Sequence, residues 1–147
     1  MGCDIHLEVE VFRDGVWRRV PGQVELCLIC DGTGCVHCDH GKLGRSFYED
    51  RNYSVFAALA DVRNDGTVAV IARSRGLPAD ISTEAAELVR EYSDHSFSWL
   101  TMAEVIAYDW AKNVGIYRCN RFMDVVRGQL LPLGDPRLTR IVFGFDS

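Results

Sequence analysis

The sequence predicts a single domain of the α+β class, with a mainly antiparallel sheet and two to three helices. Two observations carry this prediction. The chain opens with alternating apolar and polar residues followed by an Asp-Gly turn, and the later strand and helix signals show no regular repeat. A third observation, a cysteine-rich segment without apolar periodicity, predicts an insertion at 27–46 that is held together by zinc. The 147 residues, 48% of them hydrophobic, suit one domain with its own core.

The first expected element is a β-hairpin. In "DIHLEVEV", residues 4–11, apolar side chains at odd positions alternate with ionisable ones at even positions, which is the pattern of a half-buried strand. Asp14-Gly15 then predicts a two-residue turn into "VWRRV", and Pro21-Gly22 ends the second strand. One face of the first strand is therefore apolar and the other ionisable.

The middle of the chain predicts two helices and one strand. "RNYSVFAALADV" has apolar residues at helical spacing, with Asn52 placed as the N-cap. After a turn at 64–66, "TVAVIA" at 67–72 is interpreted as a β-branched strand. An irregular loop at 74–82 leads to Ser82, which is expected to cap a helix ending near Glu91.

The last third predicts two strands around a helix. "SDHSFSWL" at 93–100 alternates like a strand, and Thr101 with Glu104 forms a capping box for a helix through about Lys112. "LTRIVFGFD" at 138–146 is expected to be an edge or closing strand.

The cysteine segment, "CLICDGTGCVHCDHGK", is an eight-residue repeat with two Cys-x-x-Cys pairs. Each half resembles the Cys-x-x-Cys-x-Gly-x-Gly unit of the zinc domain of DnaJ-type chaperones, although the gap between the pairs is shorter here. Tetrahedral zinc needs four ligands, which the four thiolates could supply, and a closed site of this kind is structural. His40 in place of the last cysteine fits retroviral-type knuckle spacing, and reduced or redox-active dithiols are a further alternative. The predicted zinc ligands are Cys27, Cys30, Cys35 and Cys38.

Composition limits the class of partner and the compartment. The formal net charge of −5 gives no general attraction to nucleic acid, so binding of bulk nucleic acid is not expected. We expect no membrane association, because the chain shows neither a leader nor an apolar run of membrane-spanning length. Clustered thiols favour a metal site in a reducing compartment, so a cytoplasmic location is expected.

Four strings outside the cysteine segment carry a family resemblance: "MGCDIH", "RNYSVFAALADVRN", "RGLPADIS" and "DHSFSWLT". They resemble strings in a family of small, uncharacterised proteins of phages and prophages. The resemblance implies a phage-type origin, with action in the host cytoplasm, but no particular activity. Because phages both cleave and sequester nucleotide signals of host defence, it makes a role as an inhibitor of such signalling plausible.

The same strings concentrate polar residues, which we expect the fold to gather into one pocket for a nucleotide-like phosphoester. Arginine binds phosphate in a bidentate manner, and an aromatic side chain can stack on a base. His6 and His95 are the candidate catalytic residues. The candidate ligand-binding residues are Asp4, Arg51, Asn52, Tyr53, Arg73, Arg75, Asp94, Ser96, Ser98 and Trp99.

Two hypotheses share this pocket. In the first, the protein is a metal-independent phosphodiesterase: His95 takes the proton of a 2′-hydroxyl and His6, kept cationic by Asp4 and Glu8, protonates the leaving oxygen. In the second, the protein sequesters the ligand without turnover.

Other interpretations remain open. The zinc segment could be an adaptor for a host protein or single-stranded nucleic acid, using Lys42, Arg45, Phe47 and Tyr48. The acidic strand face around His6 could hold a second metal ion. Each histidine and arginine could also be an ordinary structural or surface residue.

Overall fold

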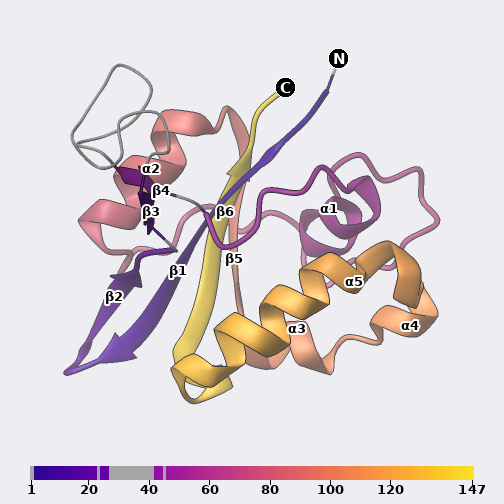
Figure 1. The fold of residues 1–147 in the computed structure, drawn as a ribbon. Helices are drawn as coiled ribbons and strands as arrows, with labels where there is room; N and C mark the ends of the chain where they lie inside the picture. Colours follow the sequence, from indigo (N-terminus) through magenta and orange to yellow (C-terminus); the bar gives the residue numbers. More distant parts are fainter. Residues whose placement is uncertain (1, 23, 27–41, 45) are drawn as a thin grey trace.

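The computed structural model describes residues 2–22, 24–26, 42–44 and 46–147 (Figure 1). In these ranges the fold is α+β, as predicted, around a four-stranded sheet in the order β2-β1-β6-β5 whose neighbouring strands are all antiparallel. The strands are β1 (Ile5–Arg13), β2 (Val16–Val20), β5 (His95–Thr101) and β6 (Thr139–Phe145).

Helices cover both faces of the sheet (Figure 1). On one face, α2 (Thr83–Tyr92) packs through a small apolar cluster of Ala85, Val89 and Val142. The larger core lies on the opposite face, where it contains Phe56, Phe122 and Phe143. The helices of that face are α1 (Tyr53–Ala60), α3 (Met102–Ala107), α4 (Trp110–Asn113) and α5 (Ile116–Val125). A π-helical turn at Val126–Leu130 and two 3-10 turns, Leu131–Leu133 and Pro136–Leu138, lead into β6.

The described ranges thus hold five α-helices rather than two or three. The helix expected through Lys112 ends at Ala107, and Asp109 starts α4 by accepting from the Lys112 amide at 3.1 Å. The capping box of Thr101 and Glu104 is present as predicted. Helix α5 was not identified from the sequence.

The β1–β2 hairpin is confirmed. Asp14 and Gly15 both have positive φ, 54° and 79°, as a two-residue turn that matches the strand twist requires. The β1–β2 ladder runs from Arg13 opposite Val16 to Val9 opposite Val20. Strand β1 therefore continues past the end of this ladder through residues 5–8, where it is paired with β6 on its other side.

Two strand predictions need correction. Residues 67–72 form no strand; instead Ile71 donates to the Ala58 carbonyl of α1 at 2.8 Å, and Val68 and Ile71 pack against the larger core. The last strand, β6, is neither an edge nor a closing strand: it lies between β1 and β5, and all seven of its residues are buried. Its nearly continuous apolar composition reflects burial on both faces.

The cysteine segment lies between two short paired strands, β3 (Val24–Leu26) and β4 (Lys42–Gly44). Their antiparallel pairing brings the chain on either side of the segment together. The predicted ligands Cys27, Cys30, Cys35 and Cys38, and the alternative His40, lie outside the described residues, so zinc binding stays a prediction. Within the described ranges, no group of three or more His, Cys, Asp or Glu side chains is arranged to hold a metal ion.

Candidate functional site

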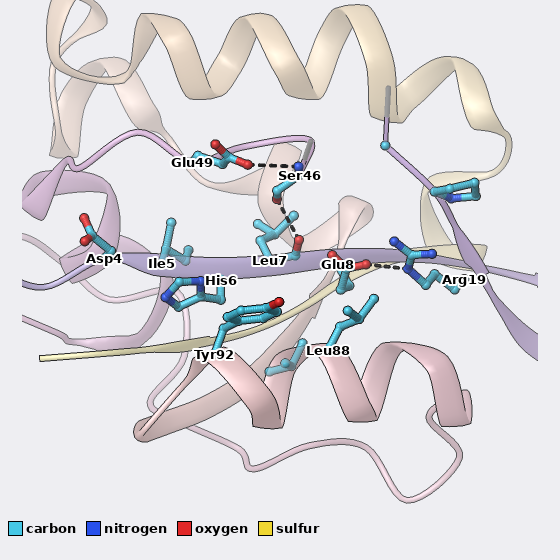
Figure 2. Close-up of a pocket in the computed structure, with 13 residues that line it drawn as sticks. Asp4, Ile5, His6, Leu7, Glu8, Arg19, Ser46, Glu49, Leu88 and Tyr92 are labelled. Carbon is cyan, nitrogen blue, oxygen red and sulfur yellow. Dashed lines mark hydrogen bonds and ion pairs between the residues drawn. The ribbon is translucent and has the colours of Figure 1, made fainter. Parts of the chain in front are cut away.

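A cavity of about 870 Å³ opens beside the part of β1 that extends past β2 (Figure 2). Its described walls come from β1, the end of β2, the segment at 46–49 and α2, and we call it the β1–α2 pocket. Its volume falls within the range of small-molecule sites. Asp4, His6 and Glu8 all line it, as expected for residues on one face of the first strand.

Two rings form one wall of the pocket. His6 projects from β1 toward α2, where its imidazole stacks on Tyr92 with 5.9 Å between ring centroids and 28° between the ring planes (Figure 2). Tyr92 is the last residue of α2 and is 55% exposed, so much of its ring is still accessible. The pair offers a flat surface for another aromatic ring.

The orientation of His6 is fixed by the end of β6. Its Nε2 lies 2.7 Å from Oδ2 of Asp146, whose Oδ1 accepts from the Asp4 amide at 3.0 Å. The Asp146 amide in turn donates to the Asp4 carbonyl at 3.1 Å. Nδ1 of His6 takes no part in the bond to Asp146.

The described lining contains one guanidinium, that of Arg19 on β2. Its Nε donates to Glu8 Oε1, and the two side chains are only 24% and 14% exposed (Figure 2). Because a guanidinium carries five N–H groups, this bond to Glu8 occupies only one of them among the contacts of the described residues.

The segment at 46–49 approaches the same stretch of β1 from the other side. Ser46 donates from its hydroxyl to the Leu7 carbonyl at 2.8 Å, and its amide donates to Glu49 Oε1 at 3.0 Å (Figure 2). Near the start of β1, Asp4 accepts both bonds of a bidentate pair from Arg51, each at 2.8 Å. The bonds from Arg51 lower the pKa of the Asp4 carboxyl below its usual value.

The pairing of β6 with β1 and β5 does not bring the two predicted catalytic histidines together. His6 lies opposite Gly144 and His95 opposite Phe145, and consecutive residues of β6 face opposite sides of the sheet. The rings accordingly have different neighbours. His6 stacks on Tyr92 of α2, whereas the His95 ring lies on the side of the larger core, with 6.2 Å between its centroid and that of the Phe145 ring. The expectation of a shared acid–base pair is therefore wrong.

A β-bulge explains the error. Strand β5 shifts register between His95 and Ser98, and Ser96 has a positive φ of 58°. With uninterrupted alternation, His95 would share a face with Trp99, which lies opposite Val142 on the α2 side. The Ser96 hydroxyl instead lies 2.8 Å from Nδ1 of His95.

Three of the predicted ligand-binding residues form a separate cluster at β5. Arg75 bonds Glu104 at 3.0 Å and the Trp99 carbonyl at 3.2 Å, and its guanidinium lies 4.8 Å from the centroid of the Trp99 ring. Its amide donates to the fully buried Ser98 hydroxyl at 3.1 Å. These side chains attach the 73–77 loop to β5 and do not line the β1–α2 pocket.

The remaining predicted ligand-binding residues either bond other parts of the fold or lie at the surface. Asn52 caps α1 by accepting from the Val55 amide at 3.2 Å, and the Tyr53 hydroxyl accepts from the Cys3 amide at 3.2 Å. Arg73 is exposed, and Asp94 is exposed with its amide bonded to the Phe145 carbonyl at 2.8 Å. Of the predicted set, only Asp4 and His6 line the pocket, with Arg51 beside them.

Sequence reasoning missed Arg19, Tyr92, Glu49 and Asp146. Tyr92 has a weak local signal as an aromatic residue at the end of a polar helix face. Asp146 has none, because its contact with His6 depends on pairing between residues 140 positions apart.

Comparison with known proteins adds no information on the function of this site. No protein-family model, curated protein or solved structure matches the chain. No helix in the described ranges is both long and apolar enough to cross a membrane.

Proposed function

We propose that this protein binds a small nucleotide-like ligand in the β1–α2 pocket and holds it without turnover. The observation that carries the proposal is the stacked pair of His6 and Tyr92 in a cavity of about 870 Å³ that also contains the Arg19 guanidinium. A base would stack on the exposed Tyr92 ring, since every base has a π face, while Arg19 would donate to a phosphoester oxygen.

Sequestration is preferred over cleavage because the acid–base mechanism required two histidines at one ligand. His6 and His95 project from opposite faces of the sheet, so they do not face one common pocket. With the phage-type resemblance, a protein that retains a nucleotide intact would act by lowering the free concentration of a host defence signal.

Thermal stability and calorimetric titration with a panel of cyclic and linear nucleotides test this proposal. A ligand that binds the native state raises the melting temperature by mass action. Tyr92→Ala should weaken binding by about tenfold or more, the usual contribution of one aromatic–base stack, whereas Tyr92→Phe should retain it.

The matched control is Tyr117→Ala. Tyr117 is 92% exposed on α5, on the other side of the sheet, so its removal should leave binding unchanged. Equal losses for the alanine variants at Tyr92 and Tyr117, or no binding by any nucleotide, would refute the proposal. Conversion of the ligand to a cleaved product would refute sequestration.

A further inference from the structure

The charges around the β1–α2 pocket restrict which nucleotides it accepts. Its described lining carries three carboxylates, on Asp4, Glu8 and Glu49, against one guanidinium and the imidazole of His6. The partners just outside the lining are Arg51, which bonds Asp4, and Asp146, which bonds His6. When both are counted, the described groups still sum to a negative charge with His6 protonated. A highly charged anion therefore meets net repulsion on entering.

Both cationic groups also have carboxylate neighbours already. Arg19 bonds Glu8, and His6 bonds Asp146. What Arg19 still offers a ligand is its terminal N–H groups, which can bond the two non-bridging oxygens of one phosphate. The terminal N–H groups of Arg19 thus match a single phosphate group that carries one negative charge.

We infer that the pocket selects nucleotides whose phosphate is a singly charged diester, as in cyclic nucleotides or internucleotide linkages, over nucleotides with a terminal phosphate chain. The inference rests on the proposed function. A diester places one negative charge against Arg19, whereas a triphosphate brings further charges toward Glu8 and Glu49, which have the same sign. No cation in the described lining is left to neutralise them.

The test is calorimetric titration at one ionic strength with one nucleoside as its 3′,5′-cyclic monophosphate, 5′-monophosphate and 5′-triphosphate. The cyclic diester should bind at least about tenfold more tightly than the triphosphate. Equal or tighter binding of the triphosphate would overturn the inference while leaving the proposed function standing. If no nucleoside of the panel bound in any of these three forms, the proposed function itself would fail, and the inference with it.

Glu8→Gln supplies a second, independent readout. The change keeps the shape of the side chain but removes the charge that neutralises Arg19, so the preference for the diester should shrink by about threefold or more. Glu87→Gln, the same charge change at an exposed position of α2, is the control and should leave the preference intact. An unchanged preference in Glu8→Gln, or an equal change in both variants, would overturn the inference.

Discussion

The strongest stability prediction concerns the buried ion pair that attaches α2 to the sheet. Arg140 on β6 and Glu10 on β1 are 2% and 0% exposed. Nε of Arg140 donates to Glu10 Oε1 at 2.9 Å, and Nη2 lies 2.7 Å from the same oxygen. The guanidinium lies 3.9 Å from the centroid of the Trp17 ring, and Glu10 Oε2 accepts from the amide of Ser82, the N-cap of α2, at 2.8 Å.

Glu10→Ala should therefore leave a buried guanidinium without its main counter-charge and remove a bond at the start of α2. Breaking a buried pair in this way costs about 3–5 kcal/mol. For a chain of this length, where 1 kcal/mol shifts Tm by about 3 °C, the expected fall is about 9–15 °C. Urea unfolding followed by far-UV circular dichroism measures the free energy, and calorimetry measures Tm.

The control for this variant uses the same arginine. Asp80 bonds Arg140 Nη1 at 3.0 Å but its side chain is 65% exposed, so Asp80→Asn should cost less than about 1 kcal/mol. A loss below about 1 kcal/mol in Glu10→Ala, or equal losses in both variants, would refute the assignment of this pair as the anchor of α2.

Further predictions concern the Arg75–Glu104 pair, the cap of α1 and the cysteine segment. Arg75→Ala should lower the free energy of unfolding by about 1 kcal/mol and leave ligand-induced shifts in Tm unchanged. Weaker ligand binding by this variant would show that Arg75 belongs to the ligand site. Because the bonds from Arg75 lower the pKa of Glu104, their pair stabilises the fold above the unfolded carboxyl pKa and ceases to do so as pH falls through the lower folded value. The cost of Arg75→Ala, measured by urea unfolding, should therefore shrink in acid, and a pH-independent cost would contradict this. Asn52→Ala should cost about 1–2 kcal/mol in urea unfolding through loss of the α1 cap, and a neutral change would refute that role. Elemental analysis should find about one zinc per chain, lost in Cys38→Ser; zinc kept there but lost in His40→Ala would favour the knuckle-type ligand set.

Local signals in the sequence were sufficient for the elements that depend on neighbouring residues. Asp14-Gly15 predicted the hairpin because a two-residue turn needs positive φ at both positions. Asn52, Ser82 and Thr101 predicted helix starts because a cap bonds an amide only three residues away.

Features that depend on long-range pairing were not predictable in this way. Nothing local places β6 between β1 and β5, which is what brings Asp146 to His6. The bulge at Ser96 likewise has no signal in the local sequence, yet it moves His95 to the other face of the sheet. The sequence therefore did not predict the partner of His6 or the position of His95. The two predicted residues at the start of the first strand, Asp4 and His6, do line the pocket.

The central claim, that the β1–α2 pocket is the ligand site, is tested most directly by NMR chemical-shift mapping during titration with a cyclic nucleotide. We predict that the largest shifts occur at His6, Arg19 and Tyr92, and that the nucleotide is recovered intact afterwards. Shifts centred on α5 around Tyr117, or no shifts at saturating ligand, would contradict it.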